Sequence, residues 1–257
     1  KPVDSAGSKG VSRVDTPEAL LEAVSYALSE AHNGHFIIED FLDKKGCSSD
    51  SDCFSINGKL AFCSFSDQKF DLDADNPYTP AAYSWPSTMP KYAKEELTNE
   101  LQRLMTLLHV KTGVYNVETR LCTNGKPYIM ELSPRGGGNR LSEMLRYITH
   151  TDLIDNAVLN AVGEKIEEIQ QPCYDGCLAE IILHSDKSGI FRKLIIDKEF
   201  EKQFVIEKDL WVENGDKVEG FTGANKAIGT LALHFSSHQE LEENVQYYKN
   251  KITIIVD

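Results

Sequence analysis

The sequence predicts an α+β fold in which helices pack against antiparallel sheets, with a β-rich subdomain at its end. Asn-Gly pairs begin at Asn57, Asn124 and Asn214, and this dipeptide is a strong signal for a tight turn between antiparallel strands. Leucines recur every three or four residues in the segment 91–108, which is typical of one face of a helix. From about Gln170 onwards, short β-type runs replace the helical pattern.

Length and charge limit the classes of protein to consider. The 257 residues can bury a substantial core and would ordinarily hold one or two domains. A formal net charge of -13 argues against a nucleic-acid partner, whose phosphates call for a basic surface. No apolar run approaches the roughly 20 residues of a membrane span, so no membrane partner is expected.

The cysteines predict a reduced, cytoplasmic protein. Cys173 and Cys177 form a lone C-x-x-x-C pair, which is not a metal-binding spacing. An even number of cysteines permits disulfides, but three lie within apparent strands, where cysteine usually acts as a small buried hydrophobe. The chain begins with Lys1 rather than methionine, and we expect a fragment whose upstream portion is absent.

The first part of the chain predicts a strand end, a loop, a helix and a strand. Residues 4–10 are rich in glycine and serine, and the N–H groups of such a loop can hold phosphates, although a flexible surface loop is the alternative. The helix 17–31 has Thr16 as its N-cap and Pro17 at its first position. The segment 35–42, with the sequence HFIIEDFL, is expected to be a strand.

The middle of the chain predicts a hairpin, a loop and three helices. The hairpin joins 53–56 to 59–65. The segment 78–90, rich in proline and serine, is expected to be a loop bordering a substrate pocket. The amphipathic helix 91–108 is expected to pack beneath the next hairpin. Two further helices are expected at 141–147 and 152–162.

The later segments predict short strands and one helix. Asp71, Asp73 and Asp75 alternate like the start of a calcium loop, but the glycine and the final glutamate of such a loop are missing, so we expect a solvated acidic loop. A capping box at Ser237 and Glu240 opens the last helix. The strands are expected at 178–184, 189–196, 210–212, 230–235 and 252–256.

The hairpin within 115–133 carries the most informative pattern. A two-residue loop at Asn124 sets Glu118 directly opposite Glu131. Their Cβ atoms would then lie about 4.5–5.5 Å apart on one face. Two carboxylates so placed repel each other unless a cation lies between them.

The two faces of this predicted hairpin differ in chemistry. One is polar and carries Asn116, Glu118, Arg120, Glu131 and Ser133. The other suits a core and carries Val117, Thr119, Leu121, Tyr128, Met130 and Leu132. Solvated glutamates on an exposed face are the alternative, but both strands lead to 134–138, where an arginine and three glycines let backbone approach an anion. The layout predicts a metal-phosphate site.

The sequence ELSPR at 131–135 closely resembles the E-x-N-P-R signature of the ATP-grasp superfamily of carboxylate–amine ligases. Glu118 matches the first metal glutamate of that family, which implies ATP and Mg²⁺ as cofactors, with Mn²⁺ able to replace Mg²⁺. Ser133 stands where the family has asparagine. Asn116 faces Ser133 in the predicted hairpin and could supply the missing amide oxygen as a metal ligand.

The resemblance implies roles for further residues. In this family a strand ending in Lys-Pro leads into a glycine loop over the ATP phosphates, which implies ATP contacts from Lys1, Ser5, Gly7, Ser8 and Gly10. The link that recognises adenine would consist of Glu39, Asp40, Phe41 and Leu42, with an acidic edge strand as the alternative. The catalytic residues would be Arg135 and Arg120. The substrate site would be lined by Gly136, Gly137, Gly138 and Asn139.

The resemblance implies a ligase that uses ATP and magnesium to activate a carboxylate as an acylphosphate for attack by an amine; the fragment alone is expected to be inactive. Its partners would be small-molecule carboxylate and amine substrates, with a homodimer also open. Residues 1–42 would form the rest of a small lobe, 43–168 a large lobe with the metal site, and 169–257 a β-rich C-terminal subdomain. Ser133 leaves a nucleotide-binding, non-catalytic module as the alternative, and a purely structural domain as a third.

Overall fold

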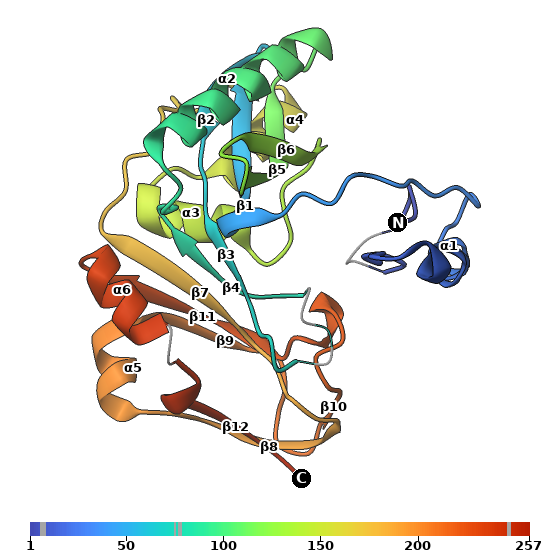
Figure 1. The fold of residues 1–257 in the computed structure, drawn as a ribbon. Coiled ribbons are helices and arrows are strands. Elements are labelled where there is room, and N and C mark those ends of the chain that lie inside the picture. The colour runs from blue at the N-terminus through green and yellow to red at the C-terminus, as the bar shows by residue number, and fades with distance from the viewer. Residues whose placement is uncertain (6–8, 75, 77–78, 246–247) are drawn as a thin grey trace.

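A mixed α/β architecture with antiparallel sheets confirms the predicted fold class (Figure 1). The structure is a computed structural model that describes residues 1–5, 9–74, 76, 79–245 and 248–257. One sheet has nine strands and the other has three, and the pairings between the named strands are antiparallel. Within the described ranges, no helix has both the length and the apolar character that crossing a membrane requires.

The elements have the following bounds. The strands are β1 (Lys44–Ile56), β2 (Lys59–Cys63), β3 (Asp67–Phe70), β4 (Pro80–Trp85), β5 (Gly113–Cys122), β6 (Pro127–Ser133), β7 (Cys177–Leu183), β8 (Gly189–Ile196), β9 (Val205–Leu210), β10 (Lys217–Val218), β11 (Gly229–Phe235) and β12 (Ile252–Val256). The α-helices are α1 (Leu20–Ser29), α2 (Lys91–Leu107), α3 (Leu141–Thr149), α4 (Leu153–Val162), α5 (Lys198–Phe204) and α6 (His238–Val245).

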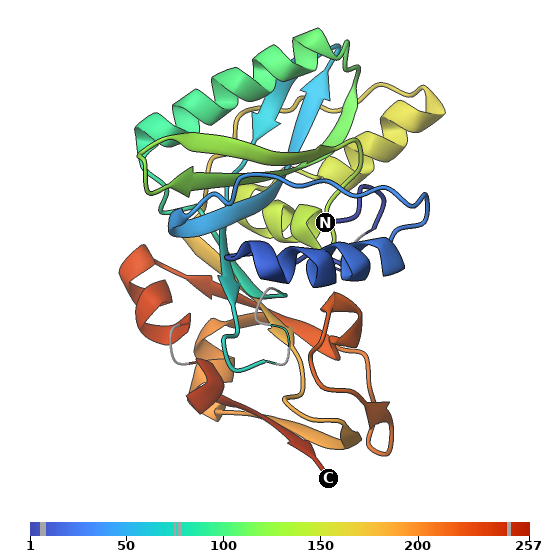
Figure 2. The ribbon, with the colours of Figure 1, turned by 45° about the vertical axis from the view of Figure 1, so that its right-hand side comes forward.

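The described residues of the segment 1–43 lie to one side of the large sheet in Figure 1, and Figure 2, in which that side comes forward, shows α1 in front of the sheet. A bridge between Pro2 and Phe36 brings the two ends of this segment together. The predicted helix forms as a 3-10 turn at Pro17–Ala19 followed by α1. Thr16 adopts the extended conformation of an N-cap, but its side chain makes no capping hydrogen bond.

The predicted strand at 35–42 is wrong. Apart from the bridge at Phe36, residues 37–43 form an irregular link that leads to β1. Ile38 and Phe41 are 67% and 52% exposed, so their apolar side chains do not join a buried sheet face. The apolar run HFIIEDFL predicted a strand from composition, but a strand also needs a neighbouring strand to pair with.

The large sheet has the strand order β6-β5-β1-β3-β4-β7-β11-β9, and β2 pairs with β1. The central strand β4 corrects the prediction of a loop at 78–90. Pro80 begins this strand, the position at which proline is tolerated, and Tyr83 and Trp85 are fully buried. Because β4 pairs with β3 on one side and β7 on the other, strands from both sides of the proposed boundary at 168/169 share one sheet.

The first Asn-Gly turn forms as predicted. Asn57 and Gly58 have φ values of 52° and 80°, and Ile56 pairs with Lys59 across the two-residue loop. Two consecutive positive φ values match the twist of the flanking strands. The loop therefore fixes the register of β1 and β2.

The loop at Asn124 differs from the prediction. The Cys122 N–H donates to the Lys126 carbonyl at 3.0 Å, so the hairpin closes around three residues instead of two. Gly125 takes a φ of 79°, as expected for the third residue of such a loop. The loop alone would shift the whole hairpin by one residue.

A β-bulge cancels this shift before the glutamates. Thr119 pairs with Ile129 on the turn side of the bulge, whereas Glu118 pairs with Glu131 beyond it. Met130 is therefore the extra residue of the bulge. Ile129 packs against the core in the place that was predicted for Met130. The core positions predicted for Met130 and Tyr128 were wrong.

The predicted helices α2, α3 and α4 are present, and two of them cover opposite faces of the sheet. Helix α2 buries Leu97, Leu101 and Met105 against β5 residues such as Val117 and Leu121. Helix α3 packs on the other face, among residues of β4 and β7. The N-cap of α4 is Asp152, whose carboxylate accepts from the Asp155 N–H.

The later strands form largely where they are predicted. The segment 205–210 is the strand β9, which begins earlier than the predicted 210–212, and neither α5 before it nor the short strand β10 was predicted. Helices α5 and α6 cover a core made of alternate residues of β7 and β11, including Ile181, Leu231 and Phe235. The last strand, β12, has the predicted bounds and pairs with β8 in the small sheet.

Candidate active site

Three carboxylates lie side by side on neighbouring strands of the large sheet. Glu118 on β5 pairs with Glu131 on β6, which confirms the predicted register, and with Asp50 on β1 on its other side. The residues that alternate with them, such as Cys53 and Val117, face α2. We call these three residues the carboxylate row, and it lies on the sheet face opposite α2.

Crowding in the carboxylate row makes two of its members hold protons more tightly. The surrounding protein atoms, and then Asp50 and Glu131, raise the pKa of Glu118 to about 7. Burial raises the pKa of Asp50 to about 6, with help from the Asp52 charge and against a hydrogen bond from Asn116. Glu118 is exposed to solvent although many protein atoms surround it. A cation bound beside it would remove part of the repulsion.

The raised pKa of Glu118 should make the metal-free protein lose stability as the pH rises. Unfolding releases the extra proton between the ordinary pKa of 4.5 and the folded value of about 7, so the unfolded state gains relative stability across that range. Above it, Glu118→Gln should be more stable than the wild type by about 1 kcal/mol, a value already reduced for solvent screening. Urea unfolding with a chelator at acidic and alkaline pH measures the difference. An unchanged difference between the two pH values would contradict this explanation.

Asn116 and Ser133 pair with each other next to the carboxylate row, as predicted. The Asn116 side chain is almost buried, and its amide nitrogen donates to Asp50 Oδ1 at 2.7 Å and Asp52 Oδ1 at 3.2 Å. The amide oxygen is then the atom that Asn116 can offer to a cation. Ser133 Oγ donates to Glu131 Oε1 at 2.9 Å, which ties it to the carboxylate row.

Asp52 holds the glycine loop at 136–138, and it was not predicted from the sequence. Its Oδ1 accepts from the Gly137 N–H at 2.8 Å, and its Oδ2 accepts a short hydrogen bond from Ser142 Oγ. Asp52 is fully buried, so these donors replace the water that its charge has lost. A Cβ on Gly137 would lie 2.5 Å from the Asn116 amide nitrogen, which explains why glycine is needed there.

The two predicted catalytic arginines have different surroundings. Arg135 is exposed, its Nη1 donates to the Gly136 carbonyl at 2.8 Å, and its charge acts on the carboxyls of Asp50 and Asp52. Arg120 Nε donates to Ser48 Oγ at 3.1 Å, and Arg120 Nη1 donates to the Leu42 carbonyl at 2.9 Å. Arg120 thus joins the polar sheet face to the link at 37–43.

Two of the predicted ATP-binding residues come together. Lys1 Nζ lies 2.5 Å from Glu39 Oε2, and the Lys1 charge also acts on Glu118. Asp40 and Phe41 are exposed, and the Arg13 guanidinium lies 4.2 Å from the centre of the Phe41 ring.

The predicted phosphate loop is only partly described. Ser5 is partly buried, and Gly10 has a φ of 71° and packs closely on Pro2. Gly7 and Ser8 lie outside the residues that the structure describes. Gly10 therefore lies against the segment that contains Lys1.

Asn139 and Arg140 extend the site beyond the glycine loop. Both have positive φ values, 52° and 57°, which is uncommon for residues other than glycine. The Asn139 amide nitrogen donates to the Tyr83 hydroxyl at 3.0 Å, and that hydroxyl donates to Asp50 Oδ2 at 3.2 Å. Asn139 is thereby connected to the carboxylate row through Tyr83.

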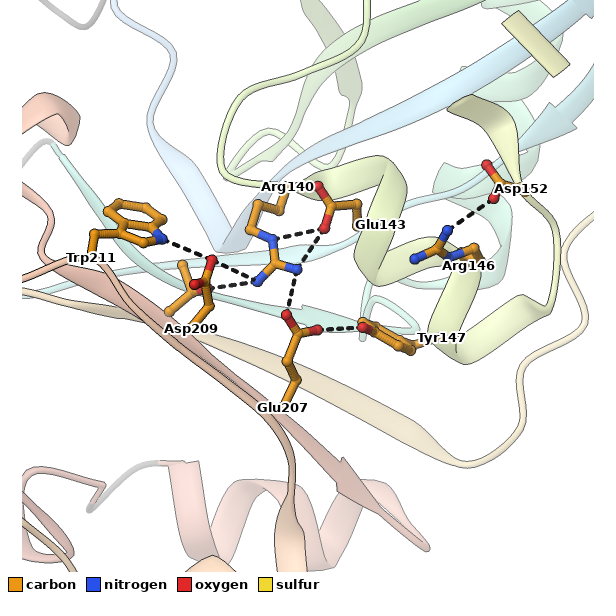
Figure 3. Close-up of polar contacts among 9 residues, drawn as sticks. Arg140, Glu143, Arg146, Tyr147, Asp152, Glu207, Asp209 and Trp211 are labelled. Atoms are coloured by element: carbon orange, nitrogen blue, oxygen red, sulfur yellow. Dashed lines mark hydrogen bonds and ion pairs between the residues drawn. The ribbon is translucent and has the colours of Figure 1, made fainter. Parts of the chain in front are cut away.

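Arg140 is the centre of a second polar cluster, shown in Figure 3. Its guanidinium contacts Glu143 Oε2 at 2.5 Å and Glu207 Oε1 at 2.7 Å, and donates to Thr230 Oγ1 at 3.0 Å. Tyr147 donates a short hydrogen bond to the other oxygen of Glu207. These contacts join the start of α3 to β9 and β11, so they anchor the end of the glycine loop. Sequence reasoning missed them because they link residues far apart in the chain.

Comparison with protein families and curated proteins identifies relatives of this chain. The sequence model of the ATP-grasp domain family matches residues 1–143. The chain is 28% identical over 148 residues to the ATP-grasp enzyme fsqD of Aspergillus fumigatus, which is 52% of this chain and 25% of that protein. It is 33% identical over 86 residues to carnosine synthase 1 of Gallus gallus, which is 34% of this chain and 9% of that protein. The matched regions are therefore small parts of both relatives.

Solved structures share the fold at low sequence identity. An L-amino acid ligase from Bacillus licheniformis matches 100% of this chain and 62% of its own, with a TM-score of 0.77 and 20% identity. The biotin carboxylase domain of a Hydrogenobacter thermophilus 2-oxoglutarate carboxylase, solved with MgADP, matches 100% of this chain and 57% of its own, with a TM-score of 0.75 and 13% identity. At these identities the likeness concerns the fold.

Proposed function

The chain belongs to the ATP-grasp domain family, and from that membership we propose that its protein is an ATP- and magnesium-dependent ligase that joins a carboxylate to an amine. The carboxylate row, next to the glycine loop that Asp52 holds, is the observation that carries the proposal. Carboxylates on adjacent strands repel each other and suit a site for a divalent cation. Mg²⁺ prefers one or two carboxylates, with phosphate oxygens and water completing its shell.

The donor set fits Mg²⁺ or Mn²⁺. Glu118 and Glu131 would be the carboxylate ligands, and Asn116 or Ser133 would add a neutral oxygen. A bound cation would neutralise phosphate charge during phosphoryl transfer. The raised pKa of Glu118, about 7, supports the assignment, because a carboxyl that resists ionisation by itself gains most from a cation.

The reaction would have two steps. The substrate carboxylate attacks the γ-phosphoryl group of ATP, which gives an acylphosphate and ADP. The amine then attacks the acyl carbon, and inorganic phosphate and a proton leave as the amide forms. Arg135 would hold the phosphate or the carboxylate, and the N–H groups of 136–138 would meet the oxyanion. Lys1 and the link at 37–43 would contact ATP.

Some wider assignments rest on the same proposal. We assign residues 1–42 to a small lobe, 43–168 to a large lobe and 169–257 to a C-terminal subdomain. The expected partners are small-molecule carboxylates and amines, with a homodimer open, and the expected compartment is the cytoplasm. The L-amino acid ligase whose structure matches 100% of this chain supports an amino acid as one substrate class.

A screen of the intact protein for phosphate release tests the proposal. Carboxylates and amines would be supplied in pairs with MgATP, and turnover should require both members of one pair. A nucleotide-binding module without catalysis would bind ATP and show no phosphate release with any pair. A purely structural domain would show no magnesium-dependent ATP binding.

The relative roles of Asn116 and Ser133 can be separated by alanine substitution. Asn116→Ala should weaken Mg²⁺ activation by about tenfold, because the amide oxygen is lost and Asp50 and Asp52 lose their shared donor. Ser133→Ala should weaken it less, because that hydroxyl donates to Glu131 and leaves the carboxylate in place. The magnesium concentration for half-maximal turnover measures both. A larger effect at Ser133 would sink the idea that Asn116 replaces the family asparagine.

A further inference from the structure

A second group of possible metal ligands lies just after the ends of β3 and β7, two inner strands of the large sheet. Asp71 follows β3, and His184 and Asp186 follow β7. One ligand atom from each of the three lies within 4.8 Å of the others. Asp71 and His184 are buried, whereas Asp186 is exposed and borders, with His184, a cavity of about 420 Å³. The group therefore combines two buried residues with an exposed one at the cavity.

The hydrogen bonds of His184 prepare one ring nitrogen for a cation. Nδ1 lies 2.7 Å from the Ile182 carbonyl, and a carbonyl oxygen only accepts, so Nδ1 carries a proton. Nε2 lies 3.0 Å from Asp71 Oδ2. Nε2 is therefore the ring nitrogen that faces the carboxylate, and a cation between these two atoms would contact both.

A histidine that donates one N–H to a backbone carbonyl while its other nitrogen faces a carboxylate has the arrangement of a metal ligand. The second-shell hydrogen bond fixes the tautomer and the ring orientation. The His184 ring also stacks on Phe221, with 4.0 Å between ring centroids, so it cannot rotate freely. The ligand atom is therefore held in place before any ion arrives.

Lys249 now stands at the cation position. Its Nζ lies 2.5 Å from Asp71 Oδ2 and 3.9 Å from Asp186 Oδ1. The Lys249 side chain is 43% exposed, so it can move into solvent without uncovering a core. The ammonium of Lys249 thus supplies positive charge to both carboxylates. A divalent cation in its place would supply more.

We propose that Asp71, His184 and Asp186 form a binding site for a divalent transition-metal ion such as Zn²⁺, with Lys249 as the side chain that the ion displaces. One imidazole nitrogen and two carboxylate oxygens suit Zn²⁺ and similar ions and leave a fourth position for water. In a tetrahedral site with bonds of about 2.0–2.1 Å, ligand atoms lie about 3.3 Å apart. His184 and Asp71 already meet this spacing, and the exposed Asp186 has to close on them.

This site is separate from a calcium loop and from the carboxylate row. Asp71 was expected to lie in a solvated acidic loop, yet it is buried and contacts His184. The ion would connect the β3–β4 connection with the β7–β8 connection, so its effect would be on the stability of the chain. The proposal does not depend on ligase activity.

Calorimetric titration of the nucleotide-free chain with Zn²⁺ tests the site. The wild type should bind one Zn²⁺ that Asp71→Asn weakens by more than about tenfold, the scale of changes in a ligand sphere. Lys249→Met should bind Zn²⁺ several times more tightly, because the competing ammonium is gone. Zn²⁺ should also raise the unfolding temperature of the wild type and not that of Asp71→Asn. Equal binding by the wild type and Asp71→Asn, or no binding by Lys249→Met, would overturn the proposal.

Two controls separate the site from other zinc ligands. Asp73→Asn removes a neighbouring exposed carboxylate and should bind Zn²⁺ like the wild type. Loss of Zn²⁺ binding in Glu131→Gln, with normal binding in Asp71→Asn, would place the ion at the carboxylate row instead. With Co²⁺ as the probe, intense charge-transfer absorption in the near ultraviolet would reveal thiolate ligands and so assign the ion to cysteines. Either result would overturn the proposed site.

Discussion

Glu131→Gln should lower the turnover of the intact enzyme by at least about 100-fold, which corresponds to about 2.7 kcal/mol of transition-state stabilisation. Glu131 is exposed and pairs with Glu118 at the edge of the carboxylate row, so under the proposed function its charge would serve the cation rather than the core. Glutamine keeps the size of the side chain and can still accept from Ser133 Oγ. Only the charge is removed, so the loss should be in chemistry and in metal affinity.

The measurement is phosphate release with MgATP and a carboxylate–amine pair that the wild type uses. Thermal unfolding should be nearly unchanged in Glu131→Gln. Glu164→Gln, an exposed glutamate after α4, provides the matched control and should turn over normally. Near-normal turnover of Glu131→Gln at ordinary magnesium concentrations would remove Glu131 from the metal site.

Gly137→Ala should be the most damaging of the small substitutions. The new methyl group would lie 2.5 Å from the Asn116 amide nitrogen, 2.6 Å from Leu141 Cδ1 and 3.1 Å from Asp52 Oδ1. Overpacking of this kind lowers the free energy of unfolding by about 1–3 kcal/mol. Movement of the loop by about 1 Å would also displace the N–H groups of 136–138 from the reacting centre, which lowers turnover by about 100-fold.

Gly138→Ala separates the steric effect from loss of glycine as such. A Cβ on Gly138 meets nothing within 4 Å, so its free energy of unfolding should change by less than about 0.5 kcal/mol. Urea unfolding of both variants measures the contrast. Equal destabilisation by the two substitutions would show that the contacts of Gly137 with Asn116 and Asp52 do not hold the loop.

Local patterns were sufficient where one short segment determines the structure. The leucine period at 91–108 predicts α2, and the Asn57 turn fixes its own hairpin. The prediction that Glu118 pairs with Glu131 is confirmed, although the loop on which it was based is different. The three-residue loop at Asn124 and the bulge at Met130 shift the register in opposite directions and cancel.

The elements that were missed depend on partners far away in the chain. The strand β4 looks like a loop by composition, and burial between β3 and β7 makes it a strand. The link at 37–43 has strand composition and no ladder. Asp50 and Asp52 alternate in the polar sequence of β1, which would have placed them on one face, but their carboxylates matter only because Asn116 and the glycine loop approach them.

The shared sheet limits how the proposed large lobe and C-terminal subdomain can move. Strands β4 and β7 are joined by ladder hydrogen bonds, so a cut at 168/169 would expose two strand edges with unpaired N–H and C=O groups. Each half expressed alone would be prone to edge-to-edge aggregation. For the same reason, the β-rich part cannot swing about a hinge loop relative to the carboxylate row. Any displacement of β9 and the cluster around Arg140 must bend the sheet itself. Such bending would also change the positions of β1, β5 and β6, the strands that carry the carboxylate row.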